Sequence, residues 1–297
     1  MAERPAKAAA HANNLVEDEG GNPKVAYANM HAAPSIVDIN TDLLPYIIEG
    51  DIIPTKEDIE RRLTAPRSKR GAPITATWKR WNKTSPISYT FADGFPEKGK
   101  AAVEKAMRIL ENSSCLSFER DDGSSEFGLN ITQSVERCLS TLGRFWTRQE
   151  LLLGSKCQTM GMAAHELLHA LALAHEQVRY DRDDFVTFDE SAADKTGYDD
   201  FRKMTSEEND NYGVRYDYGS VMHYSAWDYA IGRNPVLRTK DPQFMNSIGQ
   251  RQVVAFSDLK QLNAMYSCAD ACSTPPKCEN GGFPNSRDCR RCICPDF

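Results

Sequence analysis

The chain has 297 residues, a formal net charge of −6, 40% hydrophobic residues and 26% charged residues. This composition is that of an ordinary globular protein, and the net negative charge argues against a general nucleic-acid binder. No apolar run is long enough to span a membrane. The N-terminus lacks the apolar centre of a signal peptide, so a secreted form would already have lost its signal.

The first 70 residues form a distinct region that contains neither cysteine nor tryptophan. Amphipathic stretches predict short helices near residues 36–46 and 56–63, and Thr55 with Asp58 has the spacing of a helix cap. The region ends in the basic tetrapeptide Arg-Ser-Lys-Arg, whose last residue is Arg70. A solvated basic patch is one interpretation, but the position at a change in composition favours cleavage by a proprotein convertase.

Beyond Arg70 the pattern predicts an α+β fold. Strands are expected at residues 86–91, 115–118 and 128–132, and a helix is expected at residues 98–112. Residues 159–173 are the strongest helix candidate. Beyond Tyr198 the chain is polar and irregular until a closing helix at residues 257–265, for which Ser257 is the expected cap. Strands and helices grouped in this way do not form a βαβ repeat.

Cysteine usage indicates an oxidising compartment. Five of nine cysteines fall in the last 26 residues, which is typical of a disulfide scaffold. A zinc ribbon at Cys289 and Cys292 is the alternative, but no second Cys-x-x-Cys pair accompanies them. The odd count suggests a small module cut before its last cysteine. The cysteines are Cys115, Cys138, Cys157, Cys268, Cys272, Cys278, Cys289, Cys292 and Cys294.

Glycosylation sequons also support secretion, although such triplets occur by chance in other proteins. They begin at Asn82, Asn112 and Asn130.

Three of six histidines lie within eleven residues, in the sequence HELLHALALAH. His165 and His169 are four residues apart, which places both rings on one side of a helix, about 40° apart around its axis. Both can therefore approach one zinc ion. Glu166 lies between them in sequence and can reach a water molecule on the metal without ligating the metal itself. Three satisfied core histidines are the alternative, but this spacing favours a metal site.

His175 can share that ion only if the helix ends soon after His169. On a continuous helix it would lie about 15 Å along the axis from His165 and face another side. The spacing is that of the extended motif H-E-x-x-H-x-x-G-x-x-H, in which a glycine makes the turn. Here Ala172 occupies the glycine position. A left-handed alanine costs about 1 kcal/mol, which a folded core can tolerate.

The sequence from His165 to Asp183, together with Tyr-Gly-Ser-Val-Met222-His-Tyr224, resembles the signature and Met-turn of the astacin metalloproteases. The resemblance runs from about residue 81 to residue 268. It implies a metzincin fold. The expected N-terminal subdomain has a twisted, mostly antiparallel sheet with helices. The expected C-terminal subdomain is largely irregular and ends in a helix, with the active-site cleft between the two.

The resemblance also implies roles for individual residues. The three histidines would hold one Zn²⁺, and Glu166 would be the general base and then the acid. Met222 would lie beneath the metal, although a packing methionine is the plainer interpretation. Tyr224 would be a further zinc ligand that stabilises the transition state, or else a half-buried tyrosine. Glu176 would anchor the new N-terminus after activation.

The first 70 residues resemble an astacin propeptide, with residues 71–268 as the catalytic domain. Ile48-Glu-Gly-Asp51 is similar to the family's F-x-G-D segment, so Asp51 would ligate the zinc of the latent enzyme. A turn residue after a glycine is the alternative. Residues 269–297 resemble a partial EGF-like module, an arrangement similar to that of nematode astacins. Cys115–Cys268 and Cys138–Cys157 would be the family's two bridges.

These features predict a secreted zinc endopeptidase that is kept latent by Asp51 and activated by cleavage near Arg70. Its expected partners are protein substrates and a convertase. Arg251 is a candidate selector of acidic residues just after the cut bond, or else a solvated surface arginine. An inactive extracellular binding protein is the main alternative, favoured only by Ala172 and opposed by Glu166. A purely structural extracellular protein would leave the Met222 and Tyr224 segment unexplained.

Overall fold

The computed structural model describes residues 16–17, 23–24, 34–64, 77–133 and 135–295 of the chain. Residues 1–35 are a unit of their own, in which Val16–Glu17 (β1) pairs antiparallel with Pro23–Lys24 (β2). Residues 36–297 form the second unit, which contains all of the candidate site residues. The basic tetrapeptide that ends at Arg70 lies outside the described residues.

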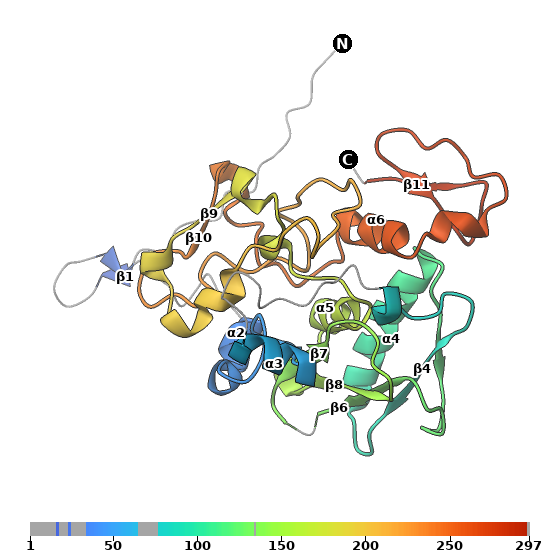
Figure 1. Ribbon diagram of the computed structural model, residues 1–297, viewed down its shortest axis with the longest axis horizontal. Helices are drawn as coiled ribbons and strands as arrows, with labels where there is room; N and C mark the ends of the chain where they lie inside the picture. The colour runs from blue at the N-terminus through green and yellow to red at the C-terminus, as the bar shows by residue number, and fades with distance from the viewer. Residues whose placement is uncertain (1–15, 18–22, 25–33, 65–76, 134, 296–297) are drawn as a thin grey trace, which may run out of the picture. The chain divides into compact units, whose positions relative to one another are not determined.

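The second unit is built from the following elements (Figure 1). Its helices are α2 (Ile36–Ile39), α3 (Lys56–Thr64), α4 (Glu97–Asn112), α5 (Met160–Ala170) and α6 (Phe256–Met265). Its strands are β3 (Ile52–Ile53), β4 (Ile87–Phe91), β5 (Phe118–Arg120), β6 (Leu129–Thr132), β7 (Cys138–Thr141), β8 (Gln149–Leu153), β9 (Val186–Phe188), β10 (Leu237–Thr239), β11 (Phe283–Pro284) and β12 (Cys292–Ile293). Short 3-10 turns lie at Thr41–Leu43, Thr77–Lys79, Ser155–Cys157, Glu176–Val178, Arg182–Asp184, Glu190–Ala192, Lys195–Phe201, Pro242–Phe244 and Cys268–Ala271.

The principal sheet is mixed, with strand order β3-β7-β8-β6-β4-β5. Only β7 and β8 pair antiparallel, and the other four pairings are parallel. The expectation of a mostly antiparallel sheet is therefore wrong. Parallel neighbours need a long crossover, and α4 supplies it between β4 and β5. The pattern also missed β7 and β8, and β5 begins at Phe118, where the expected strand ended.

Helices α4 and α5 pack against each other, and α5 lies against β7 and β8 (Figure 1). Val103, Ala106 and Leu110 recur at helical spacing and therefore lie on one face of α4. All three side chains are fully buried. Every residue of α5 after Met160 is buried. A helix that is buried on all sides usually carries apolar residues on every face. The two histidines and the glutamate of α5 depart from this rule.

The C-terminal half of this unit has a core of its own, built from irregular segments, β9 and β10. Residues of the region before Arg70 contribute to both cores. Ile39 and Ile52 join the core of the sheet and α5, whereas Val37 joins the second core. Residues 36–53 therefore pack between the two halves of the protein that were expected to flank a cleft.

Helix caps show how far local patterns hold. Thr55 and Asp58 cap α3 reciprocally, because the Thr55 N–H donates to the Asp58 carboxylate at 2.9 Å and the Asp58 N–H donates to Thr55 Oγ1 at 3.0 Å. At α6 the expected cap is wrong. The helix begins at Phe256, the Asp258 carboxylate accepts from the Ala255 N–H at 2.8 Å, and the Ser257 hydroxyl donates to Asp217 instead.

Four disulfides hold the second unit, as expected of a protein that folds in an oxidising compartment. Cys115–Cys268 and Cys138–Cys157 are present, which confirms both pairings implied by the resemblance. The zinc-ribbon alternative is wrong, because Cys289 and Cys292 each form a disulfide with another cysteine. The remaining bridges are Cys272–Cys289 and Cys278–Cys292, and Cys294 is free.

The C-terminal segment, residues 272–294, is docked on the preceding part of the same unit. The Arg287 guanidinium donates from Nε to the carbonyl of Glu111 at 2.9 Å and from Nη2 to the carbonyl of Leu116. The ring of Phe283, which is 8% exposed, lies 5.5 Å from the ring of Phe256 at the start of α6. No described helix is long and apolar enough to cross a membrane.

We expect Arg287→Ala to loosen this segment, because several backbone carbonyls lose a charged donor at once. The measurement is hydrogen exchange of residues 272–294, which should accelerate while α5 stays protected. Arg290→Ala is the matched control, because Arg290 is exposed and pairs with Asp288 on its own loop. Equal exchange in the two variants would contradict the docking role of Arg287.

Candidate metal centre

Helix α5 sets the positions of two histidines. Thr159 caps its start by accepting a hydrogen bond from the Met162 N–H. Apolar side chains on every face bury the helix, which fixes its rotation. His165 and His169, one turn apart, then direct their Nε2 atoms to points 3.1 Å from each other.

The turn after α5 brings in the third histidine. Ala172 has a φ of 72°, so it adopts the left-handed conformation that glycine holds in the extended motif. Its N–H donates to the His169 carbonyl at 2.8 Å, and the Leu173 N–H donates to the Leu168 carbonyl at 2.9 Å. These two bonds form a Schellman helix end. The alanine thus makes the same turn, and His175 follows in extended conformation.

The three imidazoles converge through their Nε2 atoms. His175 Nε2 lies 3.2 Å from His169 Nε2 and 3.3 Å from His165 Nε2. Each Nδ1–H has an acceptor of its own: the Val221 carbonyl for His165, the Leu173 carbonyl for His169 and the Glu49 carboxylate for His175, at 2.8–2.9 Å. A neutral imidazole with its proton on Nδ1 has a lone pair on Nε2. Three lone pairs therefore face one point.

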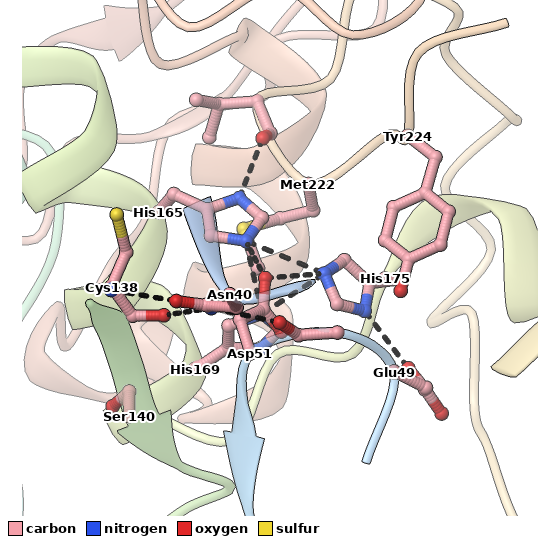
Figure 2. A network of polar contacts seen from close by, with 12 residues as sticks. Asn40, Glu49, Asp51, Cys138, Ser140, His165, His169, His175, Met222 and Tyr224 are labelled. Atoms are coloured by element: carbon pink, nitrogen blue, oxygen red, sulfur yellow. Dashed lines mark hydrogen bonds and ion pairs between the residues drawn. The ribbon is translucent and has the colours of Figure 1, made fainter. Parts of the chain in front are cut away.

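A carboxylate from the region before Arg70 completes the group (Figure 2). Asp51 Oδ2 lies 3.0 Å from His165 Nε2 and 3.2 Å from His175 Nε2, and Oδ1 lies 3.4 Å from His169 Nε2. A tight turn presents it, in which Glu49 and Gly50 both have positive φ and Ile48 pairs with Ile52.

Two further contacts hold this turn in place. A Cβ on Gly50 would lie 2.9 Å from Val37 and 3.1–3.2 Å from the hydroxyls of Tyr229 and Tyr224, so only glycine fits there. The fully buried Asn40 amide donates to the Gly50 carbonyl at 2.8 Å and to the Cys138 carbonyl at 2.7 Å. Asn40 thereby ties the turn to β7.

These four residues fit a zinc ion. Their ligand atoms lie within 4.8 Å of one another and all four side chains are buried. Burial lowers the pKa of His165 well below its usual range and also lowers that of His169, so these two imidazoles stay neutral and can ligate a metal through Nε2. Three imidazole nitrogens and one carboxylate oxygen are a usual donor set for tetrahedral Zn²⁺.

Glu166 is fully buried, and neither carboxylate oxygen has a hydrogen-bond partner among the described residues. Burial raises the pKa of this carboxyl well above its usual range, the nearby Asp51 carboxylate raises it further, and Arg251 opposes both. An unpartnered buried carboxyl is costly to keep, which is a mark of a functional group. A bound dication would favour its ionised form.

The remaining predicted residues also lie around this centre. Met222 is buried beside His165, and Tyr224 is buried with its ring centroid 4.8 Å from that of His175 (Figure 2). The Tyr224 hydroxyl has no hydrogen-bond partner in the described structure. The Glu176 carboxylate accepts from Arg179 at 3.0 Å and from the Asp217 N–H at 2.8 Å, and burial raises its pKa to about 8.

Arg251 is not a solvated surface arginine. Its Nη1 donates to the carbonyls of His223 and Gln250, both at 2.9 Å, and its Nε is buried. Gly161 of α5 packs directly against its backbone, since a Cβ there would overlap the Arg251 carbonyl. Arg251 therefore lies against the helix that carries the first two histidines.

Sequence reasoning missed three residues of the site: Asn40, Glu49 and Asp200. The Asp200 carboxylate accepts from the Glu49 N–H at 2.8 Å and from the Tyr229 hydroxyl at 2.5 Å. Glu49 could have been found, because it is an acidic residue inside the turn that carries Asp51. Asn40 and Asp200 carried no signal, since single polar residues in loops look alike in a sequence.

A helix with two histidines, a Schellman turn to a third and a mixed sheet are the arrangement expected of the metzincin fold class. Comparisons with known proteins agree. Residues 73–267 match the family model Astacin (Peptidase family M12A). Zinc metalloproteinase nas-28 of Caenorhabditis elegans is 33% identical over 293 residues, 94% of this chain and 58% of that protein.

Two further comparisons extend this result. Zinc metalloproteinase dpy-31 of Haemonchus contortus is 36% identical over 258 residues, 84% of this chain and 46% of that protein. The structure of high choriolytic enzyme 1, a hatching enzyme zinc-protease from medaka (Oryzias latipes), aligns with a TM-score of 0.60 and 29% identity. It covers 65% of this chain and 96% of that one. The chain belongs to the astacin family, and it spans about half the length of these two nematode relatives.

We expect Ala172→Gly to leave the free energy of unfolding nearly unchanged or slightly higher. Relief of a left-handed alanine, about 1–2 kcal/mol, offsets the lost burial of one methyl group, about 0.8 kcal/mol. Ala101→Gly, on the exposed face of α4, is the control and should cost about 1 kcal/mol. Chemical denaturation measures both variants. An equal loss of unfolding free energy in Ala172→Gly and Ala101→Gly would contradict the prediction.

We expect the chain to bind one Zn²⁺, and His175→Ala to lose most of it, because a structural tetrahedral site needs all four donors. Metal analysis and calorimetry measure this. Zinc at 1,000 times its Kd stabilises the native chain by about 4 kcal/mol, so chelation should lower Tm. Glu166→Gln is the control that should retain the metal. Full zinc occupancy in His175→Ala would contradict the assignment.

Proposed function

We propose that this chain is the latent form of a secreted zinc-dependent endopeptidase that hydrolyses peptide bonds in proteins. The observation that carries the proposal is the Asp51 carboxylate, which lies 3.0–3.4 Å from the three histidine nitrogens. A carboxylate in that place supplies the fourth donor and leaves no position for the water that a catalytic zinc site needs. The four disulfides support secretion.

The proposed division of the chain follows from this arrangement. Residues 1–70 act as an inhibitory propeptide, residues 71–268 as the catalytic domain and residues 269–297 as a partial EGF-like module. Cleavage by a convertase near Arg70 removes the segment that carries Asp51 and opens the fourth position. The packing of residues 36–53 between the two cores supports this, since an inhibitory segment must cover the site that it blocks.

In the proposed mechanism the chain's own residues place and move the proton. When bound, zinc supplies Lewis-acid activation of water and of the peptide carbonyl. The Glu166 carboxylate, buried and unpartnered, takes a proton from the attacking water and returns it to the leaving amine. The Tyr224 hydroxyl is also unpartnered among the described residues. It would donate to the developing oxyanion, and it could serve as a further zinc ligand after the segment that carries Asp51 has been removed.

Two charged residues carry further proposed roles. Arg251 selects an acidic residue just after the cut bond, which its position against the helix that carries Glu166 supports. Glu176 binds the new N-terminal amine after activation, and its buried carboxylate now pairs with Arg179. Glycans at Asn82, Asn112 and Asn130 are part of the same proposal.

The alternative, an inactive extracellular binding protein, depended on Ala172. The left-handed conformation of this residue places His175 on the centre as a glycine would, so the alanine gives no reason to expect inactivity.

We expect peptide hydrolysis only after residues 1–70 are removed, because Asp51 then leaves the metal. Glu166→Ala should lower kcat/KM about 10²–10⁴-fold in the trimmed protein, since it removes the carboxylate that takes the proton in the proposed mechanism. Asp51→Ala should give the untrimmed chain measurable activity. The assay is hydrolysis of a peptide library, with a zinc chelator as control. A trimmed, zinc-loaded protein that cuts no peptide would favour the binding-protein alternative.

A further inference from the structure

His175 differs from the other two histidines in the source of its outer hydrogen-bond partner. His165 and His169 donate from Nδ1 to the carbonyls of Val221 and Leu173, which belong to the region after Arg70. His175 donates to the Glu49 carboxylate at 2.9 Å, and Glu49 belongs to the region before Arg70. Of the three imidazoles, His175 alone therefore depends on the proposed propeptide for the partner of its Nδ1 atom.

Glu49 is held in place as a functional residue would be. It is 7% exposed, and its N–H donates to the buried Asp200 carboxylate at 2.8 Å. Its φ of 47° is left-handed, at a turn position where asparagine or glycine is the usual residue. A side chain with a Cβ is strained in this conformation. Such strain persists where the surrounding structure requires the side chain.

We propose that Glu49 is a positioning residue for zinc, acting through His175, so that the latent protein binds zinc more tightly than the activated enzyme. A carboxylate on the outer nitrogen of a ligating histidine fixes the tautomer and ring orientation and makes the ligand more basic. Loss of such a partner lowers metal affinity about 10–100-fold. Cleavage near Arg70 would remove two carboxylates together, Asp51 from the metal and Glu49 from its ligand. The inference rests on the proposed latent function.

The test is zinc affinity of the full chain, measured by competition with a chromophoric chelator, for wild type, Glu49→Ala and Glu49→Gln. We expect Glu49→Ala to bind zinc about 10–100-fold more weakly. Glu49→Gln keeps the size of the side chain and one acceptor oxygen but loses the charge, so it should fall between the two. Glu57→Ala, at an exposed position of α3, is the matched control and should equal wild type.

Removal of residues 1–70 gives an internal control, because the products of all four chains have the same sequence and should bind zinc equally. Wild-type affinity in Glu49→Ala or in Glu49→Gln would overturn the inference, since a merely structural glutamate tolerates the isosteric amide. Failure of the proposed function is separate. A trimmed protein without peptidase activity refutes the function, whereas equal zinc affinities of the full chains refute only the role of Glu49.

Discussion

The convergence of three imidazole nitrogens at one buried point is the constraint on which the rest of this structure depends. Atoms 3.1–3.3 Å apart that all present lone pairs repel one another unless a positive charge lies between them. Burial makes the arrangement costlier still, because no water can reach the nitrogens. The helix, the turn at Ala172 and the segment that carries Asp51 all serve to hold donors around that charge.

Three carboxylates lie around the same point. Asp51 reaches the nitrogens directly and Glu49 reaches them through His175, while Glu166 stays unpartnered. Two of these three carboxylates come from the region before Arg70. Removal of that region would leave Glu166 as the remaining carboxylate of these three. Glu166 is the group that the proposed chemistry needs.

Much of the site could be predicted from the sequence, because the spacing of His165, His169 and His175 allows few geometries. The Asp51 contact was predicted through resemblance alone, since no local rule brings residues more than a hundred positions apart together. Sheet direction could not be predicted. Strands β7 and β8 were missed because a mixed sheet is set by packing against α5 and not by alternation within each strand. Asn40 could not be predicted either, because it acts by donating hydrogen bonds to the backbone carbonyls of Gly50 and Cys138. Such bonds depend on the fold and follow no sequence pattern.

The most direct test of the central claim is X-ray absorption at the zinc edge of the untrimmed chain, compared with the chain after removal of residues 1–70. The account predicts three imidazole nitrogens and one carboxylate oxygen in the untrimmed protein, at about 2.0–2.2 Å. Asp51→Ala should replace that oxygen by solvent. A zinc shell with fewer than three imidazoles in the untrimmed chain would contradict the account.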